Sequence, residues 1–255
     1  MQKDIEHLFG GDLRVPGMRP SGAVLSSLIG ASASSRALPV TVVAIRGRPD
    51  QGLLSAHDPR HARGEHIRLL RTELQLRHTS RQSALAMAVL GAEAGEGRSQ
   101  LAAELALSFA QLNRSTLLLD ADLRHPRQHA LFGIPLEGGL AQVIAQGQPP
   151  IFFGIEGYPT VAVMTAGVSL SNPLELLSDG RFDALVNELG RMFEVIIVDT
   201  PRCSEYADGL VIAAVVGRVF TVFRCGHTRH KAARLMLRQL VSARADILGG
   251  VLNQF

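Results

Sequence analysis

A glycine-rich segment between two apolar stretches carries the residues best suited to chemistry. Residues 90–100 read LGAEAGEGRSQ, follow the apolar run 84–90 and open an Ala/Leu-rich stretch that predicts a helix. In such a turn the backbone N–H groups point inward and the helix N-terminus adds partial positive charge, so a phosphate can bind. The segment approximates G-x-x-x-x-G-K-[ST], with Ala92 at the first position, Gly97 and Ser99 in place, and Arg98 at the lysine position. The predicted phosphate-binding residues are Ala94, Gly95, Glu96, Gly97, Arg98, Ser99 and Gln100.

Acidic residues follow two later apolar runs. Asp120 and Asp122 come after the run 117–119, and Asp199 ends the run 195–198. In open α/β sheets, ligands bind outside the carboxyl ends of the strands. An acid there can hold Mg²⁺ directly or through water, a serine hydroxyl such as that of Ser99 can join it, and a second acid can orient a nucleophile. The three segments in this order predict a P-loop nucleotide-binding domain, with Ser99, Asp120 and Asp199 as the metal ligands.

The order of predicted elements indicates an α/β fold, a doubly wound and mostly parallel sheet. The expected strands are 84–90, 115–119, 160–164, 194–198, 218–224 and 247–252, and the expected helices are 98–112, 173–177, 181–192, 207–216 and 229–243, with a broken helical region at 125–146. Residues 61–255 are expected to form the P-loop domain. Residues 1–60 are expected to be a partly irregular N-terminal extension, with a short strand at 38–45.

Composition restricts the class of protein. Hydrophobic residues make up 46% of the 255 residues, and no apolar run approaches the roughly 20 residues needed to span a bilayer. The N-terminus has acids and lacks the apolar core of a signal peptide. Cys203 and Cys225 lack metal-site spacing and are expected to be reduced thiols of a cytoplasmic protein. Residues 1–81 hold eleven Arg and one Lys against seven acids, an excess that suits nucleic acid, anionic lipid, solvated helices or subunit contacts.

A helical pattern also begins near Glu65. Ile67, Leu70 and Leu74 form an apolar stripe, and Glu65, Arg68 and Arg71 lie on the other side. Spacing alone favours a solvated face, with a Glu65–Arg68 pair worth a few tenths of a kcal/mol. The alternative is a contact surface for a neighbouring subunit.

Together these motifs resemble one family. Residues 92–99 resemble a Walker A motif, 117–124 a Walker A′ motif and 195–201 a Walker B motif. The set is similar to that of the bacterial tyrosine kinases (BY-kinases) of capsule and exopolysaccharide systems, which are relatives of the MinD/ParA ATPases. Further similarities are the Glu65-x-x-Arg68-x-x-Arg71 motif and the segments 124–126, 131–133, 138–140, 172–177 and 249–253. The resemblance covers about residues 53–255 and favours the subunit-contact interpretation of Glu65, Arg68 and Arg71.

The resemblance implies a role in polymer export. ATP or ADP and Mg²⁺ would be the cofactors, and Asp120, Asp122 and Arg98 the catalytic residues, with Asp122 as the base for an incoming tyrosine hydroxyl. The implied partners are the cytoplasmic tail of a membrane polysaccharide copolymerase and further copies of the chain in a ring. The protein would be peripheral at the inner membrane, touching it only through the partner, and would not bind nucleic acid. Cycles of tyrosine autophosphorylation would tune polymer length and export.

Two departures from the family pattern support an alternative function. Arg98 and Gln100 replace the usual lysine and threonine, and an arginine is a bulkier, planar cation at a close-fitting phosphate site. The two tyrosines, Tyr158 and Tyr206, form no cluster. The alternative is a catalytically weak or inactive scaffold of the same machinery. A MinD-like positioning role is disfavoured because Glu93 stands at the signature lysine position. A nucleic-acid ATPase is disfavoured because aromatics are scarce in residues 1–81.

Overall fold

The computed structural model describes residues 41–58, 60–78, 83–168 and 172–254. The strands in these ranges are β1 (Thr41–Gly47), β2 (Leu85–Gly91), β3 (Thr116–Asp120), β4 (Ile151–Ile155), β5 (Tyr158–Met164), β6 (Val195–Asp199), β7 (Arg218–Arg224) and β8 (Asp246–Asn253). The helices are α2 (Leu54–His57), α3 (Ala62–Arg77), α4 (Arg98–Ala110), α5 (Gln128–Phe132), α6 (Leu140–Gln146), α7 (Pro173–Ser178), α8 (Arg181–Met192), α9 (Asp208–Val216) and α10 (His230–Ser242).

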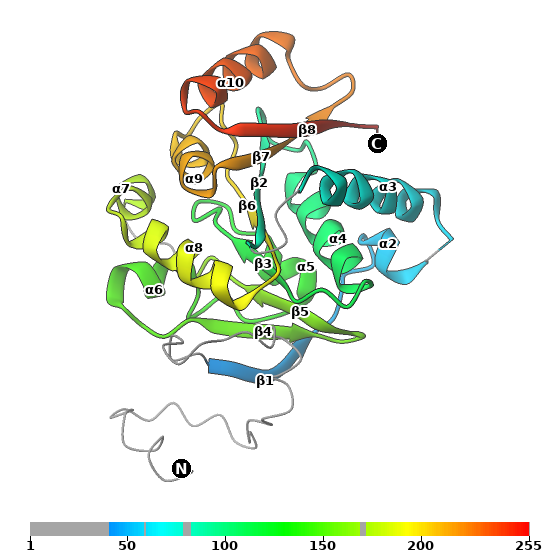
Figure 1. Ribbon diagram of the computed structural model, residues 1–255, viewed down its shortest axis with the longest axis vertical. Coiled ribbons are helices and arrows are strands. Elements are labelled where there is room, and N and C mark those ends of the chain that lie inside the picture. Colours follow the sequence, from blue (N-terminus) through cyan, green and yellow to red (C-terminus); the bar gives the residue numbers. More distant parts are fainter. Residues whose placement is uncertain (1–40, 59, 79–82, 169–171, 255) are drawn as a thin grey trace.

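The strands form one sheet in the order β1-β4-β5-β3-β6-β2-β7-β8 (Figure 1). Every neighbouring pair is parallel except β4 and β5, which pair antiparallel. The fold predicted from the alternation of strands and helices, a doubly wound and mostly parallel α/β sheet, is therefore confirmed. The strand that precedes the glycine-rich segment, β2, lies between β6 and β7, so the motifs on β2, β3 and β6 end at the same edge of three adjacent strands.

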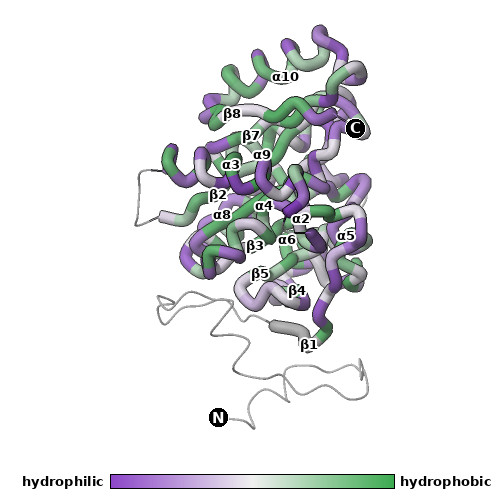
Figure 2. Tube along the Cα trace, turned by 90° about the vertical axis from the view of Figure 1, so that its right-hand side faces the viewer, coloured by the Kyte–Doolittle hydropathy of each residue, from purple (hydrophilic) through white to green (hydrophobic). Residues whose placement is uncertain are grey.

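Helices cover both faces of the sheet. On one face α4 packs on β3, β5 and β6 and is itself covered by α2, α3 and α5. On the other face lie α6, α7, α8 and α9. Successive residues of β3 alternate between the two hydrophobic cores, with Leu118 in the core under α4 and Leu117 and Leu119 in the opposite one. Burial on both faces explains why β3 and β6 are continuously apolar. Hydrophobic residues concentrate along these central strands in Figure 2.

Two described elements lack a counterpart among the expected ones, the strand β4 and the short helix α2. β4 follows two prolines and contains Gly154, so its sequence carries no alternation, and the strand is formed by pairing with β1 and β5. β5 begins at Tyr158, two residues before the start expected from the sequence. Within the segment 1–60, residues 41–47 form β1 at the edge of the sheet, and the rest of the expected strand 38–45 lies outside the described residues.

None of the helices in the described ranges combines the length and the apolar character needed to cross a bilayer.

Candidate functional site

The glycine-rich segment connects β2 to α4, as the sequence predicts. Gly95 and Gly97 have φ angles of 72° and 89°, in the left-handed region that favours glycine. Gly91 is needed for a different reason, because a Cβ there would lie 2.2 Å from Oε2 of Glu96 and 2.9 Å from Cδ of Arg98. Those two side chains therefore fold back over the end of β2. We call residues 91–99 the phosphate loop.

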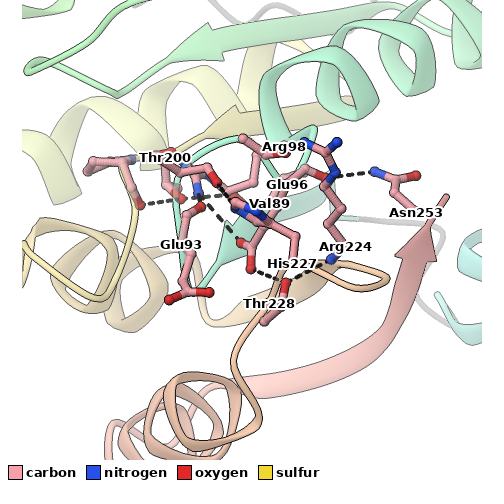
Figure 3. Close-up of polar contacts among 12 residues, drawn as sticks. Val89, Glu93, Glu96, Arg98, Thr200, Arg224, His227, Thr228 and Asn253 are labelled. Atoms are coloured by element: carbon pink, nitrogen blue, oxygen red, sulfur yellow. Dashed lines mark hydrogen bonds and ion pairs between the residues drawn. The ribbon is translucent and has the colours of Figure 1, made fainter. Parts of the chain in front are cut away.

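Arg98 is built into the body of this loop. Its Nη1 donates to the carbonyl oxygen of Glu93 at 2.7 Å, and its Nε donates to the carbonyl oxygen of Thr200 at 3.2 Å (Figure 3). The side chain is only 10% exposed. Arg98 thus joins the first half of the phosphate loop to the end of β6. Its Nη2 has no hydrogen-bond partner within the described ranges, so that N–H group is available to an anion.

Glu96 is a buried carboxyl beneath the loop. Its Oε1 accepts a hydrogen bond from the hydroxyl of Thr228 at 2.6 Å, and its backbone carbonyl accepts one from Nδ2 of Asn253 at 2.8 Å. Its Oε2 lies 3.8 Å from Nη1 of Arg98 and has no hydrogen-bond partner among the described residues. Burial raises the pKa of Glu96, and the hydroxyl of Thr228 opposes that rise. The ionised form of Glu96 therefore depends on Thr228 and Arg98 for its stabilisation.

The connection between β7 and α10 forms hydrogen bonds with the phosphate loop. Both the backbone N–H and the guanidinium of Arg229 donate to the carboxylate of Glu93, and these bonds lower the pKa of Glu93. The ring Nε2 of His227 lies 2.8 Å from the carbonyl oxygen of Ala94. Figure 3 shows this segment against the phosphate loop. The shape of the loop is thus set by residues more than a hundred positions away.

Asp120 and Asp199 lie side by side at the ends of β3 and β6, where they are paired in register. Both are completely buried. Burial raises the pKa of Asp199 to about 6, and the nearby Ser99 hydroxyl and Gln128 amide oppose that rise. Burial and the charge of Asp199 raise the pKa of Asp120 well above its usual value. Two buried carboxylates in this position are unfavourable while both are ionised, and a cation that joins them would relieve this.

Gln128, at the start of α5, connects the acids to the phosphate loop. Its Nε2 donates to Oδ2 of Asp199 at 2.8 Å and to the carbonyl oxygen of Ser99 at 3.0 Å. Its backbone N–H donates to Oδ2 of Asp120 at 3.0 Å. Oδ1 of Asp199 is buried and has no hydrogen-bond partner in the described part of the chain. An acceptor oxygen left open beside Ser99 fits a divalent cation.

Such a cation would also need oxygens from outside the protein. No group of three or more His, Cys, Asp or Glu side chains placed to hold a metal occurs in the ranges that the structure describes. Mg²⁺ characteristically binds through one or two carboxylates together with water and phosphate oxygens. The arrangement of Ser99, Asp120 and Asp199 therefore suits Mg²⁺ that arrives with a nucleotide better than a resident metal.

Asp122 shapes the turn after β3. Its Oδ1 accepts hydrogen bonds from the backbone N–H of Arg124 at 3.2 Å and of His125 at 2.8 Å. The guanidinium of Arg124 in turn binds Asp208 at 3.1 Å, which is almost fully buried at the start of α9, and lies 4.2 Å above the ring centre of Tyr206. The turn that carries Asp122 is thus fixed to the segment that follows β6.

The other predicted residues lie around this centre. Ala94, Gly95 and Gly97 form the crest of the phosphate loop, and the side chain of Gln100 points away from it, donating to the carbonyl oxygen of Gly52 at 2.9 Å. The three residues predicted for the subunit contact lie on α3, a separate part of the molecule.

Glu65 and Arg68 form an ion pair of 2.6 Å on the surface of α3. Arg71 is turned inward, where its Nη1 donates to the carbonyl oxygen of Ser108 at 2.7 Å and contacts its hydroxyl at 3.2 Å. The subunit contact stays a prediction, and the structure divides its residues into an exposed pair and a buried arginine.

Gln128, Thr228, Asn253, His227 and Arg229 were not predicted as site residues from the sequence. Gln128, Thr228 and Asn253 come from α5, from the connection after β7 and from the end of β8. Each is a common polar residue without a recognisable spacing to the phosphate loop, so only the register of the sheet brings it there. The segments 124–126 and 249–253, noted for their family resemblance, lie next to Gln128 and include Asn253.

Known proteins with similar sequences are kinases. No protein-family model matches the chain. The tyrosine-protein kinase YwqD of Bacillus subtilis (strain 168) is 29% identical over 209 residues, which cover 81% of this chain and 87% of YwqD. The tyrosine-protein kinase etk of Escherichia coli (strain K12) is 31% identical over 205 residues, 78% of this chain. The matched region is only 28% of etk, so this chain corresponds to one part of that larger protein.

Solved structures that are similar to this chain include kinase domains of the same kind. The kinase domain of the Escherichia coli tyrosine kinase ETK superposes with a TM-score of 0.75 at 29% identity, covering 79% of each chain. The kinase domain of VpsO superposes with a TM-score of 0.66 at 30% identity, covering 74% of this chain and 93% of that domain. MinD of Pyrococcus horikoshii OT3, solved with Mg-ADP, shares the fold alone, with a TM-score of 0.58 at 16% identity. With its phosphate loop, paired strand-end acids and these relatives, the chain belongs to the bacterial tyrosine kinase family.

Proposed function

We propose that the protein binds Mg-ATP and serves as the ATP-binding component of an exopolysaccharide or capsule polymerisation and export system. The observation that supports this most directly is the open Oδ1 of Asp199, buried beside Asp120 and next to the phosphate loop. A purely structural aspartate at a strand end would be expected to have both oxygens satisfied. A nucleotide-bound cation would satisfy this oxygen and neutralise both carboxylates.

The chain's own residues then have distinct roles. The N–H groups of residues 95–99 would hold the phosphates, and Ser99, Asp120 and Asp199 would hold Mg²⁺ directly or through water. Mg²⁺ supplies charge neutralisation at the β- and γ-phosphates. Asp122 would accept the proton of a tyrosine hydroxyl through Oδ2, because Oδ1 is engaged by the N–H groups of Arg124 and His125. This is tyrosine autokinase-type chemistry, which would regulate polymer length or export.

Arg98 favours a second candidate function, that of a catalytically weak or inactive scaffold. In phosphoryl transfer the protein contributes chiefly position and charge. The guanidinium of Arg98 is held by the carbonyl oxygens of Glu93 and Thr200, so its charge is fixed in the wall of the loop. To follow a moving phosphoryl group it would have to break these bonds. Nucleotide binding is therefore compatible with the geometry even where turnover is slow.

One experiment separates the two functions. Nucleotide affinity and phosphotyrosine are measured together with Mg-ATP for the wild type, Arg98→Lys and Asp122→Asn, with the exposed α8 variant Asp183→Asn as the matched control. Phosphotyrosine in the wild type that is lost in Asp122→Asn and kept in Asp183→Asn supports the kinase. Binding without phosphotyrosine, in both the wild type and Arg98→Lys, supports the scaffold. Phosphotyrosine only in Arg98→Lys would assign the defect to one side chain. No binding of Mg-ATP by any form would overturn the proposal.

The proposed partners follow from family membership. The protein would work beneath the membrane, on the cytoplasmic side, bound to the cytoplasmic tail of a polysaccharide copolymerase and assembled with copies of itself into a ring. Glu65 and Arg68 on the exposed side of α3 are placed to take part in such a contact. Co-purification of the two proteins from membranes, compared with a copolymerase that lacks its cytoplasmic tail, tests the first part.

A further inference from the structure

Helix α10 lies at one extremity of the molecule, beyond β8 (Figure 1). It buries Met236 and Leu240 against the domain. Its opposite face is exposed along its whole length, which is about 20 Å for 13 residues. The exposed residues are His230, Lys231, Arg234, Leu235, Arg238, Val241 and Ser242. In the side view of Figure 2 the helix again lies at the end of the molecule, so a flat surface can approach it without meeting the rest of the domain.

This face is uniformly positive. The sequence has no acidic residue between Asp208 and Asp246, and seven Lys or Arg residues lie in that interval. The side chains of Lys231, Arg234 and Arg238 form no ion pair or hydrogen bond with any residue in the described ranges. The charge on α10 is therefore left for an external anion.

Several arginines elsewhere on the surface are paired with acids within the chain. Arg48 pairs with Glu156, Arg114 with Glu194 and Arg191 with Glu188. α10 differs in that three cations without such a pair among the described residues lie on one helix face.

Exposed apolar side chains border the positive stripe. At 3.6 residues per turn, Lys231, Arg234 and Arg238 share one stripe, with Val241 on one side and Leu235 on the other. Leu235 is 55% exposed and Val241 68% exposed. Cations flanked by aliphatic residues on one helix face suit a lipid interface, where headgroups take the charge and the acyl boundary takes the aliphatic groups. The Phe, Tyr or Trp side chains that stack on the bases of a single-stranded nucleic acid are absent from this helix.

We propose that α10 rests on an anionic bilayer surface, with Lys231, Arg234 and Arg238 contacting lipid headgroups and with Leu235 and Val241 entering the interface. Each cation near an anionic leaflet raises the partition coefficient about fivefold, so three raise it roughly a hundredfold. Such binding is reversible, and it would supplement a contact made through a membrane partner. It does not depend on nucleotide turnover, so it stands or falls separately from the proposed kinase function.

Vesicle binding of the full chain tests the proposal. The wild type is expected to co-sediment with phosphatidylglycerol–phosphatidylcholine vesicles and not with phosphatidylcholine alone, and to be released when NaCl rises from about 50 mM to about 500 mM. Arg234→Glu with Arg238→Glu should weaken binding at least about 25-fold. The matched control, Arg48→Glu with Arg191→Glu, changes net charge equally on exposed arginines elsewhere and should bind as the wild type does. Equal loss in both variants, or no binding by the wild type, would overturn the proposal. So would retention of a duplex DNA probe in place of vesicles.

A second measurement reports how deeply the exposed face of α10 enters the bilayer. Because the chain has no tryptophan, Leu235→Trp introduces a single fluorophore on the proposed contact face. Its emission should shift to the blue with anionic vesicles and be quenched by brominated lipid. The control is Leu76→Trp on α3, where the leucine is 78% exposed, and its emission should not change. An unshifted Leu235→Trp spectrum on vesicles that do bind the protein would exclude insertion of this face.

Discussion

Asp120 and Asp199 are paired in register on the neighbouring parallel strands β3 and β6, and no solvent reaches either carboxyl. Neither forms an ion pair with a side chain of the described residues, and the N–H groups of Gln128 are among the donors that hold them. The parallel register itself therefore forces two acids together at the mouth of the phosphate loop. A site of this kind stores an unfavourable electrostatic interaction until a cation arrives.

We expect Asp199→Asn to stabilise the nucleotide-free protein at neutral pH. The pKa of Asp199 is about 6 in the folded chain, against roughly 4 in the unfolded chain. A carboxyl whose pKa rises on folding favours the folded state below about pH 4 and loses that contribution as pH rises through its folded pKa. The variant should gain up to about 3 kcal/mol and show a flatter pH dependence in urea unfolding. The exposed control Asp183→Asn should leave the pH slope unchanged; an unchanged slope in Asp199→Asn would contradict the expectation.

Arg98→Ala should destabilise the fold even without nucleotide. It removes two charge-assisted hydrogen bonds and leaves the carbonyl oxygens of Glu93 and Thr200 without this donor, at a cost of about 2–3 kcal/mol in the free energy of unfolding. Arg191→Ala, which removes an exposed arginine with a surface ion pair, should cost less than about 1 kcal/mol. Equal effects of the two substitutions in chemical denaturation would show that Arg98 does not brace the loop.

Glu96 and Thr228 should be energetically coupled. Thr228→Val leaves a buried carboxylate oxygen without its hydroxyl donor and should cost about 2 kcal/mol. In the background Glu96→Gln the same change should cost less, because the side chain is then uncharged. A double-mutant cycle measures the difference. The conservative Thr228→Ser should restore stability, and additive single and double variants would argue against the coupling.

The two arginines of the α3 motif should behave differently. Arg71→Ala should lower the free energy of unfolding by about 2 kcal/mol, because its guanidinium is buried against Ser108. Arg68→Ala should instead lower the oligomer mass in light scattering and change stability less than Arg71→Ala does, because the ion pair of Arg68 with Glu65 is on the surface. Unchanged mass for Arg68→Ala would remove it from the predicted subunit contact.

Much of the fold follows from the sequence because its central strands are buried on both faces. Such strands are short, uninterrupted apolar runs, and the helices between them have clear apolar spacing. The bounds expected for α8 and β7 agree with the structure residue for residue. β4 could not be predicted, because it is stabilised by pairing with neighbouring strands and not by a local sequence pattern. Two prolines before it and a glycine within it also interrupt the apolar spacing.

The residues of the candidate site likewise fall into those that the sequence predicts and those that it does not. Local motifs mark Ser99, Asp120 and Asp199, because each sits at a strand end or loop with a fixed spacing. Gln128 and Thr228 have no such mark, because their positions depend on which strands lie next to each other. Likewise the sequence indicates that Arg98 is unusual, whereas only the structure shows that its guanidinium is already occupied by two backbone carbonyls.

The bonds from Arg229 to Glu93 have a further consequence. Arg229 directly precedes α10, so the first turn of that helix is tied to the phosphate loop through one carboxylate. In hydrogen exchange we therefore expect the loop and the start of α10 to open together, because opening either segment would break these bonds. Filling the loop with a nucleotide would therefore slow exchange at a surface that the nucleotide never touches.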